Sequence, residues 1–271
     1  MLHILIPVFN NPEGLAASLR SIPDDAVIPI IVVDNASTDQ TATVLQEATA
    51  ARRHLHVVRN PANLGRIGNW NRCLEVAESL SARHILFIMA GDRFLADHHR
   101  DAIAALSDQD RADTAVTLFP ILTERGDHVT LVRDLSLKGI RDRATLLDAL
   151  FRYGVPFLGP LQACAISSAD SRFGRFDEAA GQYHADQDYV ASRVLDAQAV
   201  VIASTPITAM NLAQRKTHGT VKRTDLLHQD LAFMRSIHQR AWQTPPSILR
   251  HAIWYLANIY RYFGRRNTDA R

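Results

Sequence analysis

Two short apolar runs near the N-terminus, each closed by a polar turn, constrain the fold of this chain more than any other feature. The runs are Leu2–Val8 and Ile28–Val33. Each is followed by a helix signal, and this repeat of strand, turn and helix is what a parallel α/β sheet requires. Ligands of such sheets bind beyond the carboxyl ends of the strands. We therefore expect four residues of these turns at one rim of the sheet: Phe9, Asn10, Asp34 and Asn35.

The two turns also predict where the helices begin. Asn10 and Asn11 precede Pro12, and proline is tolerated in the first turn of a helix because its missing N–H would be unsatisfied there anyway. In the second turn, Gln40 follows Ser37 by three residues, which predicts a capping box. A helix is therefore expected after each turn.

In the run Leu64–Glu75, a third loop opens directly into an amphipathic helix, which we expect near Arg66–Ser79. The apolar residues at helical spacing are Ile67, Trp70, Leu74 and Ala77, and they should pack inward. Arg66, Asn69 and Asn71 then lie at the helix start, where amides and cations face a ligand.

The remaining elements follow from shorter patterns. We expect strands at Leu55–Val58, His84–Met89, Thr114–Phe119 and Pro206–Leu212, a hairpin through 123–132, and helices near 96–106 and 142–153. The stretch 154–182 is rich in glycine, proline and serine, which suits a region of loops.

Composition fits a globular enzyme. The chain has 271 residues, 47% of them hydrophobic, and can bury a large single core. Its formal net charge of +2 gives no strong field, so nucleic acid is not implied as a partner. Only Cys73 and Cys164 are present, which favours a reducing compartment. No secretory signal and no apolar run near the roughly 20 residues of a membrane span are visible, so we expect a cytoplasmic protein.

Three segments together resemble the glycosyltransferases of family 2. They are Ile6–Asn10, Val32–Asp39 and Asn63–Asn71. The resemblance implies the glycosyltransferase-A fold, an α/β domain with a mostly parallel central sheet flanked by helices. We expect a catalytic domain over residues 1–222, with a nucleotide-binding part at 1–100 and an acceptor part at 101–222, followed by a helical extension at 223–271.

The resemblance implies that a nucleotide-sugar donor binds at the rim. Asp34 would accept hydrogen bonds from the base or ribose, Phe9 would lie against the base, and Arg66 would contact the base edge or a phosphate. This chemistry favours uridine without excluding guanosine or thymidine. The alternatives are an Asx turn at Asp34 and a core position for Phe9. The predicted nucleotide-binding residues are Pro7, Phe9, Asn10, Asp34, Asn35, Arg66, Asn69, Asn71 and Gly91.

A metal site is implied where the expected strand His84–Met89 runs into Ala90-Gly91-Asp92. The family usually has an Asp-x-Asp triplet there, and only its last carboxylate is kept. Asp92 would hold a divalent cation, Mn²⁺ or Mg²⁺, that stabilises the leaving diphosphate; an aspartate in a type I turn is the alternative. A later loop supplies His218 as the second candidate metal ligand, and two candidate diphosphate contacts, Arg215 and Lys216.

Glycosyl transfer also needs a base that removes the proton of the acceptor hydroxyl. The segment Tyr183–Val190 resembles the acidic segment that carries this base in the family. The candidates are Asp186 and Asp188, in that order, with His184 as a weaker third. Either aspartate would alternatively cap the helix that follows.

The C-terminal tail resembles an interfacial helix. Tyr255, Ile259 and Tyr262 are among its apolar residues at helical spacing, and arginines supply the charge. Such a helix would make peripheral contact with the inner face of the cell membrane; a helix packed on the catalytic domain is the alternative. Membrane contact would favour a lipid-linked saccharide as acceptor over a free glycan.

These expectations describe an inverting glycosyltransferase that moves a sugar, from a UDP-sugar foremost, to a growing glycan or lipid-linked saccharide of bacterial cell-surface polysaccharide synthesis. Two alternatives remain. A sugar-phosphate nucleotidyltransferase would need a glycine-rich loop after the first strand, where this chain has Phe9-Asn10-Asn11-Pro12. A non-catalytic nucleotide-sugar-binding protein would explain the lost carboxylate at Ala90, and would bind donor without hydrolysis or transfer.

Overall fold

A computed structural model describes most of the first 212 residues and one later helix. The described residues are 1–24, 28–98, 100, 104–107, 115–125, 128–132, 139–142, 144–147, 160–168, 172–178, 184–197, 199–212, 223–242, 252, 253 and 256. The chain forms two compact units. The first comprises Met1–Arg143 and Gly159–Arg215, and the second comprises Ala144–Leu158 and Lys216–Arg271.

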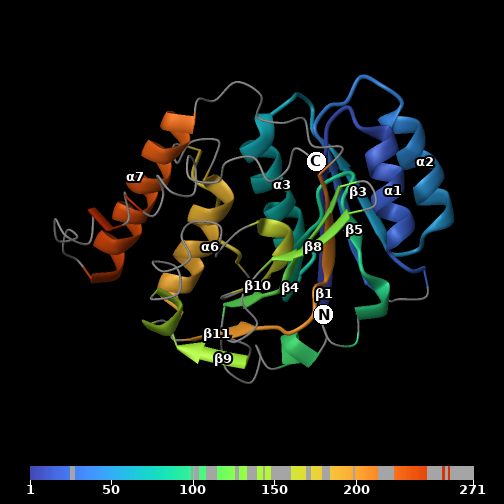
Figure 1. Ribbon diagram of the computed structural model, residues 1–271. Coiled ribbons are helices and arrows are strands. Elements are labelled where there is room, and N and C mark those ends of the chain that lie inside the picture. The colour runs from blue at the N-terminus through green and yellow to red at the C-terminus, as the bar shows by residue number, and fades with distance from the viewer. Residues whose placement is uncertain are drawn as a thin grey trace. The chain divides into compact units, whose positions relative to one another are not determined.

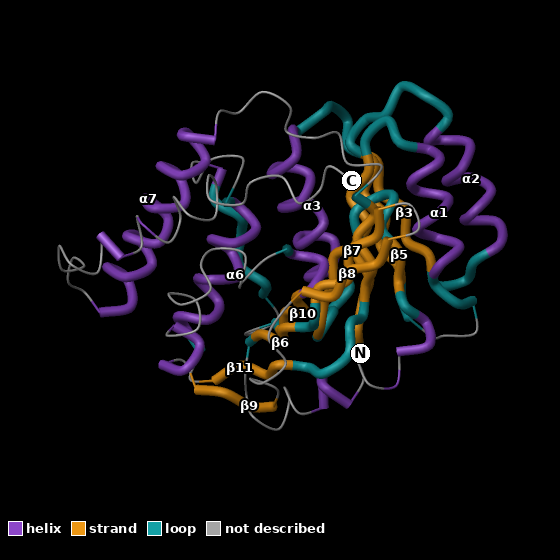
Figure 2. The backbone as a smooth tube through the Cα atoms, in the orientation of Figure 1, coloured by secondary structure: helices purple, strands orange, loops and turns teal. Residues whose placement is uncertain are grey.

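The N-terminal part of the first unit alternates strands and helices as expected (Figure 1). Its elements are β1 (Leu2–Val8), α1 (Pro12–Ser21), β2 (Ile30–Asp34), α2 (Thr41–Ala51), β3 (Leu55–Arg59), α3 (Gly65–Ser79) and β4 (His84–Phe87). The pairings β3–β2, β2–β1 and β1–β4 are all parallel. The carboxyl ends of these strands therefore meet at one edge of the sheet, where the loops that follow them gather (Figure 2).

Later segments complete the main sheet and add a second one. The main sheet has eight strands in the order β3-β2-β1-β4-β10-β6-β11-β9, with β6 (Val116–Leu118), β9 (Gly139–Asp142), β10 (Cys164–Ser167) and β11 (Ala199–Ile202). The smaller sheet has the order β5-β12-β7-β8, from β5 (Arg93–Phe94), β7 (Ile121–Arg125), β8 (His128–Val132) and β12 (Thr208–Asn211). The 3₁₀ turns η1 (Ala96–His98) and η4 (Leu161–Ala163) and helix α6 (Ala185–Asp196) belong to the same unit.

The core lies around the first strands. Every residue of β1, β2 and β4 is buried, as expected for parallel strands covered on both faces. One large cluster joins alternate residues of β1 to apolar residues of α1, among them Ile4, Ile6, Leu15 and Leu19.

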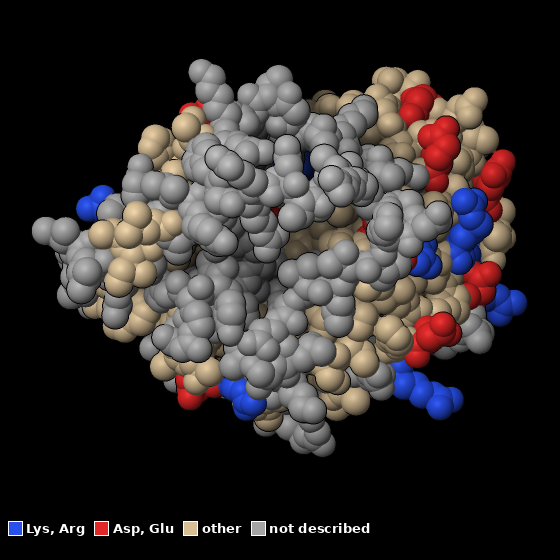
Figure 3. All heavy atoms as spheres, viewed as in Figure 1, with Lys and Arg blue, Asp and Glu red and all other residues tan. Residues whose placement is uncertain are grey.

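Basic and acidic side chains are interspersed on the described part of the face in Figure 3, in agreement with the small net charge.

In the second unit, the structure describes helix α7 (Arg223–Trp242). Its buried apolar residues recur at helical spacing and include Leu227, Leu231, Met234 and Ile237. No described helix of the chain is both long and apolar enough to cross a bilayer.

Three expectations about local structure need correction. The second strand begins at Ile30 rather than Ile28. The expected helix at 96–106 is a 3₁₀ turn over Ala96–His98, and described helical backbone returns only at 100 and 104–107. The capping box is wrong, because α2 begins at Thr41 and the N–H of Thr41 bonds to the carboxylate of Asp39, while Gln40 makes no side-chain cap.

Candidate active site

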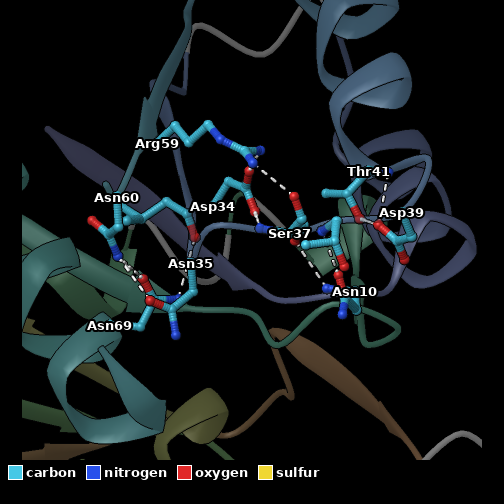
Figure 4. Close-up of polar contacts among 11 residues, drawn as sticks. Asn10, Asp34, Asn35, Ser37, Asp39, Thr41, Arg59, Asn60 and Asn69 are labelled. Atoms are coloured by element: carbon cyan, nitrogen blue, oxygen red, sulfur yellow. Dashed lines mark hydrogen bonds and ion pairs between the residues drawn. The ribbon is translucent and has the colours of Figure 1, made fainter. Parts of the chain in front are cut away.

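The loops after β1 and β2 are tied to each other at the carboxyl rim. The hydroxyl of Ser37 accepts a hydrogen bond from the backbone N–H of Asn10 at 2.9 Å, and the side chain of Asn10 accepts one from the N–H of Thr38 at 2.8 Å. Asn10 and Ala36 both have positive φ, 46° and 61°. Such backbone is rare in residues other than glycine and marks turns that their surroundings hold in place. Figure 4 shows the two loops side by side, as expected for one rim.

Asp34 lies at the centre of this arrangement. Its side chain is fully buried; one carboxylate oxygen accepts the N–H of Ser37 at 3.0 Å, and the other forms an ion pair with Arg59. Arg59 also donates to the carbonyl of Ser37 at 2.7 Å. The carboxylate of Asp34 thus bonds to the backbone three residues further on (Figure 4), whereas the alternative Asx turn would need a bond to the residue two positions on. The predicted contact of Asp34 with a nucleotide stays a prediction, as does that of Phe9, whose side chain is 45% exposed.

A cluster of asparagines fixes the start of α3. Asn60 donates to the side-chain oxygens of Asn35 at 3.0 Å and Asn69 at 2.9 Å. Asn35 in turn donates to Asn63 at 2.8 Å and to the carbonyl of Gly65 at 3.1 Å. Asn60 was not among the predicted site residues, since an asparagine after a strand gives no signal of bonds to residues 9 and 25 positions away. The predicted residues Asn35 and Asn69 thus fix the start of α3, which carries Arg66.

The other predicted asparagine of α3 faces a different partner. The side chain of Asn71 accepts the N–H of Phe176 at 2.8 Å and donates to the carbonyl of the same residue at 3.1 Å. The predicted residue Pro7 is buried within β1, where it pairs with Val33.

Helix α1 holds the turn that carries Asp92. Asn11 caps α1 by accepting the N–H of Gly14 at 3.1 Å, as Pro12 in the first turn led us to expect, and also donates to the carbonyl of Ala90 at 3.0 Å. The N–H of Gly91 bonds to the carbonyl of Gly14. Gly91 has a φ of 108°, which favours glycine. The turn is therefore held by the N-cap residue Asn11 and by Gly14 in the first turn of α1.

The carboxylate of Asp92 is almost fully buried. One oxygen accepts the side-chain N–H of Gln162 at 2.7 Å, and the other accepts the backbone N–H of Asn211 at 2.9 Å. A carboxylate oxygen can accept more than one bond, so these contacts are compatible with binding a cation. No group of three or more potential metal-binding side chains lies within the described residues. A Mg²⁺ or Mn²⁺ ion at Asp92 would have to take its other ligands from outside such a group, for example from phosphate and water, and Asp92 as a metal ligand stays a prediction.

The late loop with the remaining predicted ligands, Arg215, Lys216 and His218, lies outside the described residues. The last described residues before that loop lie close to Asp92. Asn211 bonds to Asp92, and the N–H of Leu212 bonds to the carbonyl of Glu124.

The predicted base and the predicted phosphate cation share one region. Asp186 lies in the first turn of α6, and burial raises the pKa of its carboxyl, an effect that the nearby guanidinium of Arg66 opposes. The Arg66 guanidinium lies 5.0 Å from the ring centre of Trp70 in a cation–π contact. The backbone N–H of Asp188 donates to the carbonyl of His184 at 2.7 Å in the first turn of α6. The ring of His184 bonds to the side chain of Gln187 at 2.6 Å. Asp186 therefore lies in the electrostatic field of Arg66.

Comparisons with known proteins show the family of the chain. The profile of the family described as Glycosyl transferase family 2 matches residues 3–159. The Uncharacterized protein MT1568 of Mycobacterium tuberculosis (strain CDC 1551 / Oshkosh) is 35% identical over 97 residues, which cover 35% of this chain and 29% of that protein.

Two solved structures show the fold. S. aureus TarS 1-349 in complex with UDP matches with a TM-score of 0.66 at 17% identity, over 99% of this chain and 73% of that one. The mannosyltransferase PcManGT from Pyrobaculum calidifontis in complex with GDP-Man and Mn²⁺ matches with a TM-score of 0.58 at 15% identity, over 96% and 69% of the two chains. The expected glycosyltransferase-A fold is thereby confirmed.

Proposed function

Because the chain belongs to glycosyl transferase family 2, we propose that this glycosyltransferase moves one sugar from a nucleotide-diphosphate donor to a hydroxyl acceptor, with inversion at the anomeric carbon. The observation that carries the proposal is that hydrogen bonds tie the start of α3, which bears Arg66, to the loops that follow β1 and β2. Arg66 also acts electrostatically on the buried carboxyl of Asp186 at the start of α6. This arrangement links a base to a cation at the rim where a parallel sheet binds its ligands.

The donor is proposed to be a UDP-sugar. Asp34 accepts the N–H of the base, the exposed ring of Phe9 lies against the base, and Arg66 contacts a phosphate. Asn10, Asn35, Asn69, Pro7 and Gly91 complete the nucleotide site, whereas the side chain of Asn71 is taken up by the backbone of Phe176. The similar TarS structures are in complex with UDP and with UDP-GlcNAc, which supports uridine as the nucleoside of the donor. The mannosyltransferase structure contains GDP-Man, so guanosine is tested as the alternative.

In the proposed step, the carboxylate of Asp186 removes the acceptor proton while the acceptor oxygen bonds to the anomeric carbon. The bond from that carbon to the diphosphate breaks, and its electron pair leaves with the nucleoside diphosphate. A base works best when its pKa is near the working pH. The raised pKa of Asp186 moves in that direction and places the acid limb of turnover above the range of an ordinary aspartate.

Asp92 is proposed to hold a divalent cation, with His218 as a second ligand and with Arg215 and Lys216 on the diphosphate. The cation would neutralise charge on the leaving diphosphate. The bond from Gln162 to Asp92 orients this carboxylate, and the hydrogen bond that Asn11 donates to the carbonyl of Ala90 fixes the turn that carries it.

The acceptor is proposed to be a growing glycan or lipid-linked saccharide of bacterial cell-surface polysaccharide synthesis, bound by the acceptor part at residues 101–222. The extension at 223–271 would bring the enzyme to the inner face of the cell membrane. Trp242, Ile253 and Leu256 are exposed apolar side chains of this extension, which supports a peripheral contact.

The test replaces each candidate base in turn. Asp186→Asn should bind UDP as the wild type does and lose turnover of UDP-GlcNAc, measured as release of UDP, by at least about 100-fold. Asp188→Asn is the matched control and should keep turnover within about threefold. Near-normal turnover in Asp186→Asn, or equal losses in the two variants, would exclude Asp186 as the base.

A further inference from the structure

We propose that the segment Phe173–Phe176, here called the clasp, is a positioning element that sets the distance between the base on α6 and the donor site on α3. The inference rests on the proposed function. It assigns Asn71 and Phe176 a role in turnover that neither the sequence motifs nor the family comparisons give them.

The ring of Phe176 joins three elements of the first unit. It stacks on Tyr189 of α6 with centroids 4.1 Å apart, and it contacts Trp70 of α3 at 5.2 Å and Phe87 of β4 at 5.8 Å. Its side chain is 2% exposed. Close-packed interiors transmit displacements because they hold few voids. A change in the size or position of the Phe176 ring should therefore shift both α3 and α6.

Helices α3 and α6 each contact the ring of Phe176 about one helical turn away from Arg66 and Asp186. Trp70 follows Arg66 by four positions in α3, and Tyr189 follows Asp186 by three positions in α6. Residues at these spacings lie on the same face of a helix. Phe176 is therefore held between the helix face that presents Arg66 and the helix face that presents Asp186.

The backbone of the clasp is fixed at both ends. At one end, Asn71 forms two hydrogen bonds with the backbone of Phe176. At the other end, Glu78 accepts the N–H of Phe173 at 2.8 Å and pairs with Arg175 through two contacts of 2.9 Å, while the hydroxyl of Tyr189 donates to the carbonyl of Phe173 at 2.7 Å. Both α3 and α6 thus hold the same four residues.

The bonds of Asn71 redefine its expected role. Both polar atoms of its side chain are used by Phe176, 105 positions away. Asn71 is therefore assigned to the clasp, where it acts on turnover through Phe176 rather than by contact with the nucleotide. A loss of its side chain should leave the nucleotide site intact and release the clasp.

The experiment compares Phe176→Leu and Asn71→Ala with Phe119→Leu, using UDP titration and UDP release from UDP-GlcNAc. Displacement of a reacting group by about 1 Å can cost about 100-fold in rate. We expect both clasp variants to lose about 10- to 100-fold in kcat, with the dissociation constant of UDP within about twofold of the wild type. Phe119 is also fully buried in the core, so Phe119→Leu reports what a loss of packing alone does; its kcat should stay within about threefold.

Two results would overturn the inference. One is a kcat in both clasp variants equal to that of Phe119→Leu. The other is weaker UDP binding that accounts for the whole loss, because Asn71 would then act in donor binding. Measurements on the wild-type protein distinguish a failure of the clasp from a failure of the proposed function. If the wild type binds UDP and turns over UDP-GlcNAc while the clasp variants keep its kcat, only the clasp is refuted. If the wild type neither binds UDP nor turns over UDP-GlcNAc, the proposed function is refuted and the clasp with it.

Discussion

The substitution Asp34→Asn tests whether the carboxylate of Asp34 builds the rim, binds the nucleotide, or does both. An asparagine cannot satisfy both present partners, the N–H of Ser37 and the guanidinium of Arg59, because its nitrogen would face one of these donors. A hydrogen bond to a charged group contributes about 1.5–3 kcal/mol. Arg59 is half exposed and can turn to water, which places the cost near the lower end, at about 1.5 kcal/mol.

That cost converts into a measurable melting temperature. At about 2.1 cal/mol/K per residue, the 271 residues give an unfolding entropy of about 0.57 kcal/mol/K. The melting temperature should therefore fall by about 3 °C. Arg59→Gln breaks the same ion pair from the other side and should cause a similar fall.

Calorimetric titration with UDP then separates the two roles. Asp34→Asn should weaken UDP binding by about 10-fold, and Arg59→Gln by no more than about threefold, because only Asp34 is assigned a nucleotide contact. Equal affinities in the two variants would show that Asp34 acts on the rim alone. An unchanged melting temperature in Asp34→Asn would refute the reasoning about the ion pair itself.

Two further predictions concern stability. Burial lowers the pKa of His3 below its ordinary 6.5, so the unfolded chain takes up the proton first and stability is lost as pH falls below that value. His3→Gln should therefore lose less stability than the wild type between pH 7 and pH 5 in parallel thermal melts. Identical slopes of melting temperature against pH in the two proteins would contradict this. In Gly14→Ala, the new Cβ would lie 2.4–2.7 Å from the side chain of Asn11, so the cap of α1 should be lost at about 1 kcal/mol, seen as a lower melting temperature; an unchanged value would show that Asn11 finds another rotamer that still caps.

Local signals in the sequence predicted the parts of the fold that local chemistry decides. Asn11 followed by Pro12 predicted the start of α1, because a cap involves residues within one turn of each other. The same kind of signal failed at Ser37. Its hydroxyl accepts a bond from Asn10, 27 residues earlier, and this long-range contact replaces the expected capping box.

The rim was predicted because strand ends in a parallel sheet must meet, and the loops after β1 and β2 do lie together. The partners within the rim could not be predicted. Asn60 and Phe176 reach residues far away in the chain, and a single sequence contains no sign of such pairs. Asp92 was identified through the family pattern, but its bond to Gln162, 70 residues later, depends on the fold.

The proposed nucleotide-sugar site is tested by titrating the purified protein with UDP, GDP and dTDP, each with and without Mn²⁺. We expect micromolar binding of UDP that becomes tighter when Mn²⁺ is present, and a smaller effect of Mn²⁺ in Asp92→Asn. Absence of binding to all three nucleotides would contradict the proposed nucleotide-sugar site.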